Sequence, residues 1–524
     1  MKLFTFIFLT FYITSSIGCS ISNSSSPDTS VVSESSAVKD LYRPAYHFTA
    51  DSNWINDPNG LVYHNGEYHL FYQYNPFGAK WGHMSWGHSV SSDLIHWKTL
   101  PVAMYEEKNP KDNDTTMIFS GSAVIDKENS SGFANGSQKT PLVAVYTSYV
   151  HNSSNPKVQH QSIAYSNDDG LSWTKYSGNP VIDIKSLEFR DPKVFWYEPQ
   201  QKWVMAVLKP EVHQAQLYSS KNLKEWTYMS SWGGAGNTER IWECPDLFEM
   251  NVKGTNEKKW VMLVSCGHAQ RGFPGMQYFI GNFDGTKFTP DHNYSKPTYL
   301  DFGKDFYAAV TYNNTPNDRK ILVGWMNNWE YANDIPTGKV WRGSYAIPRE
   351  LSLVRTGNEL KLIQQPVAEM NALKQEVFSL ENKHVATNLD LSYRGDSYQV
   401  ELIIEPGEAK AAGIKILKSN NEETIIKYDN VLKQLQLDRS KSGNVNFHPK
   451  FSSVETADVS LQNELIRLNI LVDRSVVEVF ANDGLATISD LVFPLQKEGG
   501  IQLFSEGGKA NFHSVKIWKM KAVK

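Results

Sequence analysis

Two carboxyl side chains stand in short segments that would hold them rigidly. Asp57 lies in Trp54-Ile-Asn-Asp-Pro-Asn-Gly60, where turn-forming residues surround a short acidic side chain. Glu243 lies in Trp242-Glu-Cys-Pro-Asp-Leu-Phe248, between an indole and a thiol. Two carboxyl groups can act as nucleophile and as general acid across a glycosidic bond. Each segment alone is more typical of an ordinary turn or a structural carboxylate, so this chemistry requires the fold to bring the two together.

A degenerate repeat provides a way to do so. Over residues 41–350, short apolar and aromatic runs alternate with Gly, Asn, Asp and Pro, which favours strands over helices. Four extended segments open with a polar residue near Pro or Gly, at Asp57, Ser120, Asp191 and Glu243. Repeated strand units of this kind are typical of a β-propeller, whose innermost strands surround one axis. We therefore expect these four residues to occupy equivalent places and to meet at one end of the channel.

The pattern of apolar and polar residues changes after residue 350. Segments such as Tyr398-Gln-Val-Glu-Leu-Ile-Ile404 and Leu465-Ile-Arg-Leu-Asn-Ile-Leu-Val472 alternate apolar and polar residues with a period of two. Such alternation predicts strands with one buried face, as in a β-sandwich. The predicted fold class is therefore all-β, with a catalytic propeller over residues 41–350, then a linker and a C-terminal β-sandwich over residues 351–524.

The first forty residues indicate export. Residues 1–19 read as a signal peptide: Lys2 precedes an apolar run at residues 3–13 that is too short to span a membrane. The run leads to Ser15-Ser-Ile-Gly-Cys19, which resembles a bacterial lipobox with Ser16 where Leu is usual. Residues 20–40 are Ser-rich, as expected of a flexible linker. These features favour a cell-surface or periplasmic lipoprotein lipidated at Cys19, and simple secretion after signal cleavage is the alternative.

Composition excludes several other classes of function. The formal net charge is −4 without a long run of either sign, so nucleic acid is not an expected partner. Of three cysteines, Cys244 and Cys266 are predicted to be buried free thiols, since their spacing fits no zinc pattern. His83 and His88 have no third metal ligand nearby, and no phosphate loop or dinucleotide motif is present. We expect neither a metal nor a cofactor, and a small neutral substrate fits this composition.

A set of motifs follows in order along the chain. They are residues 54–60 (with Ile55 where Met is common), 71–76, 81–88, 119–122, 189–195, 242–246 and, in the C-terminal part, 473–480. With these motifs the chain resembles glycoside hydrolase family 32, the invertase, inulinase and levanase group, and the resemblance covers residues 41–524.

The resemblance implies a five-bladed propeller joined to a β-sandwich. It assigns Asp57 as nucleophile, Glu243 as acid and base, and Asp191 as transition-state stabiliser. It also implies contacts with the fructosyl ring from Asn56, Gln73, Trp81, Phe119, Ser120, Arg190 and Trp325. The expected activity is retaining hydrolysis of terminal β-D-fructosyl units of levan, inulin or sucrose, with fructose as product.

Two other functions remain open at this stage. An inverting arabinan hydrolase on a similar propeller would need a wider carboxylate gap that admits a catalytic water. A non-catalytic sugar-binding lipoprotein could keep Trp81 and Trp325 but would not need Asp57 and Glu243 together. At the level of single residues, the two indoles could pack in the core, and Arg190 and Asp191 could form a structural ion pair.

Overall fold

The computed structural model describes residues 41–523, apart from residues 112, 135, 137–138, 153–154 and 269–271. The predicted signal peptide (1–19), the linker (20–40) and Cys19 lie outside the described residues. The rest consists of strands β1 to β35 and short 3-10 helices, which confirms the predicted all-β class. The 3-10 helices of the described part are η1 (Glu198–Gln200), η2 (Pro210–Val212), η3 (Pro316–Asp318) and η4 (Ala368–Leu373). No helix among the described residues is long and apolar enough to cross a membrane.

Five sheets make up the N-terminal part of the described chain. The first contains β21 (Trp341–Arg342), β1 (Asn53–His64), β2 (Glu67–Asn75), β3 (Ser85–Ser91) and β4 (Lys98–Met104). The second contains β10 (Ile182–Ser186), β8 (Asn155–Ser166), β7 (Leu142–Asn152), β6 (Thr115–Ile125) and β5 (Glu107–Lys108), with β9 (Thr174–Lys175) paired to β8. The third contains β11 (Arg190–Tyr197), β12 (Lys202–Lys209), β13 (Gln214–Ser220) and β14 (Thr227–Gly233). The fourth contains β15 (Glu243–Asn251), β16 (Lys258–His268), β17 (Phe273–Phe283) and β18 (Phe288–Pro290). The fifth contains β19 (Tyr307–Thr311), β20 (Ile321–Trp325), β22 (Arg349–Thr356) and β23 (Glu359–Pro366).

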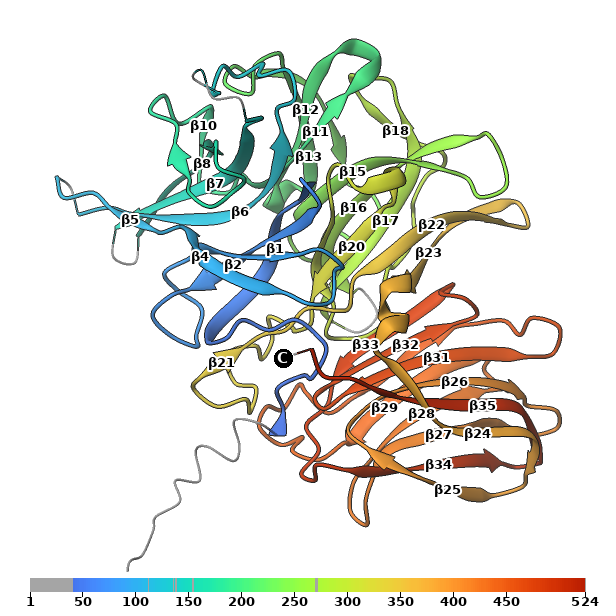
Figure 1. Cartoon of the computed structure of the whole chain (residues 1–524). Helices are drawn as coiled ribbons and strands as arrows, with labels where there is room; N and C mark the ends of the chain where they lie inside the picture. The colour runs from blue at the N-terminus through green and yellow to red at the C-terminus, as the bar shows by residue number, and fades with distance from the viewer. Residues whose placement is uncertain are drawn as a thin grey trace, which may run out of the picture.

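These sheets close into a ring. Strand β1 contacts β6, β6 contacts β11, β11 contacts β15, β15 contacts β19, and β19 returns to β1. In Figure 1 the labelled strands β1, β6, β11 and β15 of this ring lie close together in the upper half of the molecule. Second strands such as β12 are apolar and buried between their two terminal lysines, because neighbouring blades cover both faces. The described residues thus form a propeller with one blade per sheet, and its innermost strands are β1, β6, β11, β15 and β19.

The fifth blade continues beyond the predicted boundary at residue 350. That boundary falls inside β22, and its partner β23 completes the blade as far as Pro366. The sandwich begins only with β24 at Lys374. Only the first half of β23 alternates as the sandwich strands do, and its last residues, Gln364-Gln365-Pro366, resemble a linker, so the sequence pattern does not assign β23 to the propeller.

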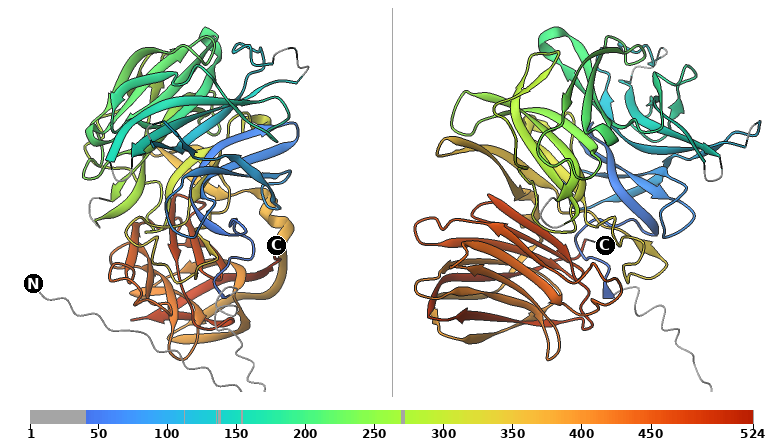
Figure 2. Two further views of the ribbon diagram at one scale, coloured as in Figure 1. Left: turned by 90° about the vertical axis from the view of Figure 1, so that its left-hand side faces the viewer. Right: turned by 180° about the vertical axis from the view of Figure 1, so that it is seen from behind.

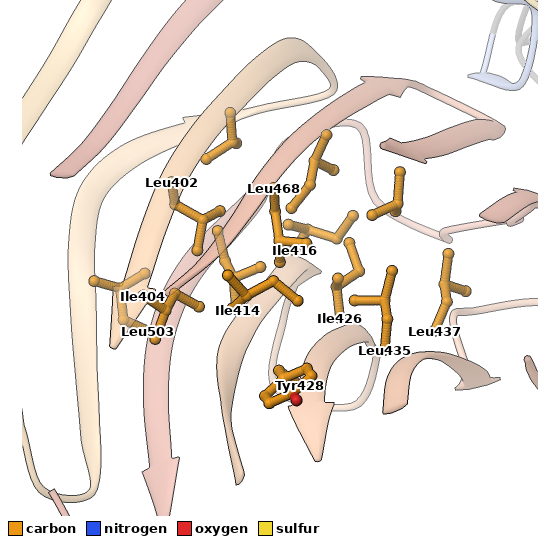
Figure 3. Packing of buried hydrophobic residues seen from close by; sticks show 14 of the residues in the cluster. Leu402, Ile404, Ile414, Ile416, Ile426, Tyr428, Leu435, Leu437, Leu468 and Leu503 are labelled. Carbon is orange, nitrogen blue, oxygen red and sulfur yellow. The ribbon is translucent and has the colours of Figure 1, made fainter. Parts of the chain in front are cut away.

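Two six-stranded sheets form the C-terminal sandwich. In order, one contains β24 (Lys374–Val385), β35 (Ala510–Met520), β26 (Ser397–Glu405), β31 (Ile466–Asp473), β32 (Val476–Ala481) and β33 (Ala486–Leu491). The other contains β25 (Asn388–Gly395), β34 (Gly499–Glu506), β27 (Ala411–Lys418), β28 (Glu423–Asp429), β29 (Gln434–Lys441) and β30 (Val454–Asp458). Alternate residues of both sheets, such as Leu402, Leu468 and Ile414, meet in the core between them (Figure 3). Each such side chain contributes about 1.5–3 kcal/mol by leaving water.

The sandwich packs against one side of the propeller, and the described chain begins and ends near their junction (Figure 2). Asp473 of the sandwich accepts hydrogen bonds from the backbone N–H groups of Ala45 (2.6 Å), Tyr46 (2.8 Å) and His47 (2.9 Å). Glu478 accepts one from the backbone N–H of Ile347 at 2.9 Å. The segment predicted as a sandwich signature therefore fixes the start of the chain and the last blade in place.

Candidate active site

A β-bulge interrupts each innermost strand at a comparable place. The pairing register shifts between Ile55 and Pro58, Ile118 and Gly121, Arg190 and Lys193, Glu243 and Asp246, and Tyr307 and Val310. A bulge leaves residues unpaired and turns their side chains away from the regular alternation. Asp57, Ser120, Asp191 and Cys244 lie inside these bulges, at the end of the channel where the innermost strands begin.

The bulges correct one prediction, that Glu243 occupies the place equivalent to Asp191. Asp191, Cys244 and Ala308 have φ values of 64°, 49° and 53°, a left-handed conformation that is strained for residues other than Gly. Cys244, and not Glu243, therefore takes the place equivalent to Asp191. Glu243 is one residue earlier, in the position of Arg190. The sequence pattern aligns Glu243 with Asp191, whereas the backbone aligns the residues directly before Pro192 and Pro245.

Asp57 is buried and held by neutral donors. Ser120 Oγ donates a hydrogen bond to its Oδ2 at 2.6 Å, and Asn56 Nδ2 donates to its Oδ1 at 3.0 Å. The Cys244 thiol lies 3.5 Å from the same Oδ2. Burial raises the pKa of Asp57, the donors partly offset this, and the negative charge of Glu243 raises the pKa further. The effect of Glu243 shows that the two predicted catalytic carboxyl groups interact.

Glu243 is more accessible and is held by two other blades. Arg190 donates to its Oε1 from Nε at 3.1 Å and from Nη2 at 3.0 Å. Tyr307 Oη donates to its Oε2 at 2.8 Å. The Glu243 side chain keeps 20% of its surface exposed. Tyr307 is absent from the predicted set because the fifth repeat opens with Phe306-Tyr-Ala-Ala-Val310, without the Pro or Gly that marks the others.

Asp191 is the third buried carboxyl group of this end. Its Oδ2 lies 3.6 Å from Arg190 Nε and accepts a hydrogen bond from the backbone N–H of Cys244 at 3.2 Å. Burial raises its pKa to about 8, because Arg190 offsets only part of that cost and the charges of Glu243 and Asp57 add to it. A carboxyl group that keeps its proton near neutral pH can donate a hydrogen bond to a hydroxyl group.

The remaining predicted residues surround this centre. Gln73 is buried and donates to the carbonyl of Ile118 at 2.9 Å, next to Phe119. The Phe119 ring lies 6.4 Å from that of Trp81, whose surface is 40% exposed. Gln73 is thus linked to the backbone two residues before Ser120, and Trp81 contacts the same strand through Phe119.

Trp325 is buried, which fits the alternative of core packing and not direct contact with the fructosyl ring. It is 0% exposed and packs 5.9 Å from Trp54, whose indole N–H donates to Asn56 at 2.7 Å. Trp329 packs 4.7 Å from Trp325 and is 37% exposed. The indole that a sugar ring could reach is therefore Trp329, which the sequence did not single out because it lies outside the repeated strands.

The remaining polar candidates do not form a metal centre. Within residues 41–523, excluding the gaps given above, no group of three or more His, Cys, Asp or Glu side chains is placed to hold a metal ion. His88 stacks on Phe71 at 4.0 Å, and His83 lies 2.5 Å from Glu106. Cys244 and Cys266 are both free and buried, as predicted.

Comparisons with known proteins agree with this geometry. The model of the glycosyl hydrolases family 32 N-terminal domain matches residues 47–366, and that of the family 32 C terminal matches residues 369–519. The Levanase of Bacillus subtilis is 46% identical over 502 residues, covering 94% of this chain and 72% of that protein. The Extracellular exo-inulinase of Aspergillus awamori is 40% identical over 512 residues, covering 91% of this chain and 94% of that protein.

Solved structures show the same relationship. The exo-inulinase of Aspergillus awamori superimposes with a TM-score of 0.88 at 39% identity, covering 92% of this chain and 99% of that chain. A fructofuranosidase of Schwanniomyces occidentalis, complexed with fructosylnystose, gives 0.83 at 31% identity, covering 92% and 98%. The chain belongs to glycosyl hydrolase family 32.

Proposed function

We propose that the protein is a retaining β-fructofuranosidase that removes terminal β-D-fructosyl units from levan, inulin and sucrose. The observation that carries this proposal is the meeting of Asp57 and Glu243 at one end of the propeller, in different hydrogen-bonding environments. The names of the relatives, levanase, exo-inulinase and fructofuranosidase, supply the substrate class.

The two carboxyl groups have complementary roles in the first step. The Asp57 carboxylate attacks the anomeric carbon of the fructosyl unit, while Glu243 gives its proton to the leaving oxygen. The bond to the leaving group breaks, the remainder of the substrate departs as an alcohol, and a fructosyl ester of Asp57 remains. Asp57 suits this attack because its hydrogen-bond partners are neutral and no cation is bound to it.

Water completes the cycle. Glu243, now a carboxylate, removes a proton from a water molecule that attacks the same carbon, and Asp57 leaves as a carboxylate. Two displacements at one carbon restore the β configuration. Arg190 and Tyr307 fix the Glu243 carboxyl group throughout, since each donates to one of its oxygens.

Asp191 stabilises the oxocarbenium-like transition state through hydrogen bonds to ring hydroxyl groups, which tighten as the ring flattens. Its backbone is held by the left-handed bulge and by a hydrogen bond from its N–H to Thr147 Oγ1 at 3.1 Å. The proposed contacts with the fructosyl ring come from Asn56, Gln73, Trp81, Phe119, Ser120 and Arg190, with Trp325 acting through Trp54.

The attack is of the exo type, because the proposed contacts with the fructosyl ring all surround one terminal unit. A fructan chain that continued beyond this unit would have little room. Fructose release from sucrose, inulin and levan tests the function, and chromatography of early digests tests the mode. Fructose as the dominant early product is expected. Early fructo-oligosaccharides with little fructose would contradict exo attack, and no release from any of the three substrates would contradict the function.

The protein is exported and anchored through a lipid on Cys19. The support is the apolar run that ends at the lipobox-like segment, together with the word extracellular in the names of several relatives. Cys19→Ala should move the protein from the membrane fraction to the soluble fraction. A wild-type protein that is already soluble would overturn the anchor and leave simple secretion.

A further inference from the structure

A second cavity lies at the other end of the innermost strands. Its volume is about 590 Å³, and its walls include residues near the ends of four of those strands: Val124 of β6, Phe195 of β11, Glu249 of β15 and Thr311 of β19. A strand advances about 3.3 Å per residue, so Trp196 in this cavity lies roughly 15 Å along β11 from Asp191. The size is that of a pocket for a small molecule or a short oligomer.

Polar contacts across the channel separate this cavity from the catalytic end. Lys193 Nζ donates to the carbonyl of Thr311 at 2.6 Å and lies 3.2 Å from Asp246 Oδ2. Below them, Asn313 Nδ2 donates to the carbonyls of Ala123 (2.8 Å) and Val194 (3.1 Å). The second cavity is therefore a separate site on the propeller and not the back of the first.

Aromatic rings form two of its walls. Phe195 and Tyr197 pack against Trp260, with ring centroids 5.4 Å and 6.0 Å apart. On the other side, Trp196 meets Trp203 edge to face at 4.9 Å. Trp196 and Tyr197 are only half-buried, so ring surface remains available to a ligand.

The polar part of the lining restricts the ligand class. Glu198 accepts hydrogen bonds from Trp196 Nε1 at 2.6 Å and from Gln201 Nε2 at 2.7 Å, so its carboxylate is positioned at the aromatic wall. Acidic side chains outnumber lysines among the lining residues, which disfavours an anionic ligand: Asp126, Glu128, Glu198, Glu249 and Asp318 against Lys127, Lys193 and Lys320. Polar groups make up a large share of the walls, which disfavours a purely apolar ligand. A neutral ring with C–H faces and hydroxyl edges satisfies both conditions.

We propose that this cavity is a second carbohydrate-binding site that holds a short stretch of a fructan chain away from the catalytic end. The identification of the sugar as fructan rests on the proposed function. Binding of internal units keeps the polymer close to the enzyme, which raises the effective concentration of chain ends at the catalytic site.

Affinity electrophoresis of the full chain in gels that contain levan tests the site. The parent carries Asp57→Asn, which prevents turnover, and levan should retard it. Adding Trp196→Ala should weaken levan binding about tenfold, because a stacking ring is lost, and Glu198→Ala should weaken it about threefold. The matched control is Tyr228→Ala, which removes a 52% exposed tyrosine of the same blade that lies outside the cavity and should change nothing.

Turnover provides the second readout. With Asp57 intact, Trp196→Ala and Glu198→Ala should keep wild-type kcat/KM on sucrose, which is too short to reach both sites. Levan binding equal to the parent in both variants would overturn the proposal, and so would a parallel loss of sucrose turnover, which would indicate structural damage. Failure of the proposed function would appear differently, as a wild-type enzyme that releases no fructose.

Discussion

Two buried groups of carboxyl side chains in this protein have opposite electrostatic surroundings. At the junction of the domains, Asp473 and Glu478 flank His47 at 2.9 Å and 2.8 Å, and Arg349 Nε donates to Glu478 at 3.1 Å. Burial alone would raise the pKa of Asp473 and Glu478, but His47 and Arg349 outweigh it and hold both values below their usual range. Burial would likewise lower the pKa of His47, yet its two acidic partners raise it to about 9.

At the catalytic end, the partners of the buried carboxyl groups offset only part of the cost of burying their charges. Asp191 and Glu243 share one guanidinium, that of Arg190, which is itself also bound to Glu188. Asp57 is hydrogen-bonded to the neutral side chains of Asn56 and Ser120. Burial therefore dominates, and it raises the pKa of Asp57 and brings that of Asp191 to about 8. The same residue types at similar burial stabilise the fold at the junction and work against it at the catalytic end, as expected where function sets the arrangement.

The largest expected effect concerns the catalytic group. Asp57→Asn should lower kcat about 10⁴-fold or more, because an amide cannot form the fructosyl ester. Steady-state turnover of sucrose by the purified variant measures this, and circular dichroism should show an unchanged fold. A purified variant that retains substantial turnover would exclude Asp57 as the nucleophile.

The next largest effect is the loss of stability when one member of the charged group at the domain junction is replaced. Asp473→Asn should lower the free energy of unfolding by about 3–5 kcal/mol, because it leaves His47 and three backbone N–H groups with a poorer acceptor. Urea unfolding measures the change. Asp458→Asn, at an exposed position of β30, is the control and should stay within about 0.5 kcal/mol of wild type. Equal stabilities of the two variants would mean that the junction group contributes nothing.

The same substitution at the catalytic end should have the opposite sign. Asp191→Asn removes an incompletely compensated buried acid while keeping an acceptor for the Cys244 N–H, so stability should rise by about 0.5–2 kcal/mol. Activity should fall, since the stabilising hydrogen bonds to the substrate change. Thermal unfolding beside wild type is the measurement, and a clear loss of stability would show that Asp191 is a structural partner of Arg190.

A smaller effect is expected in the pH dependence of stability, which should differ between the carboxyl groups of the catalytic end and those of the junction. Because the pKa of Asp191 rises from 3.8 to about 8 on folding, the native state holds a proton that the unfolded state loses, and stability falls as pH rises across that window. The lowered pKa values of Asp473 and Glu478 act in reverse, with stability lost as pH falls below their ordinary values of 3.8 and 4.5. The contribution of His47 is complete below 6.5 and is lost as pH rises through about 9.

Melting temperatures of wild type and Asp191→Asn across this range test the difference. The gain from Asp191→Asn should be larger near about pH 8 than near about pH 5. A gain that does not depend on pH would contradict the raised pKa of Asp191.

Much of the catalytic end could be predicted from the sequence, because its bulges coincide with local motifs. Asp57, Ser120 and Asp191 each stand directly before Pro or Gly, and the repeat of that pattern indicates a shared place on the innermost strands. Tyr307 has no such marker. Glu243 lies one residue before the place equivalent to Asp191. That place is defined by the left-handed backbone of Cys244, which the side-chain pattern does not reveal.

The junction could not be predicted as a contact because it depends on long-range pairing. His47 and Asp473 are 426 residues apart, and the motif at residues 473–480 does not indicate which part of the chain it contacts. The exposure of Trp329 and the burial of Trp325 likewise depend on how the loop after β20 packs on Trp54. The sequence does not mark the end of the fifth blade at Pro366, because the last residues of β23, Gln364-Gln365-Pro366, resemble a linker.

Trapping the fructosyl-enzyme tests the central claim most directly. In Glu243→Gln, β-D-fructosyl fluoride needs no acid for its leaving group, so the ester on Asp57 should form, while its hydrolysis lacks a base and should be slow. Mass spectrometry of the intact variant should then show the added mass of one fructosyl unit, and peptide mapping should place it on Asp57. An adduct on another residue, or fluoride release without any adduct on the protein, would contradict a retaining mechanism through Asp57.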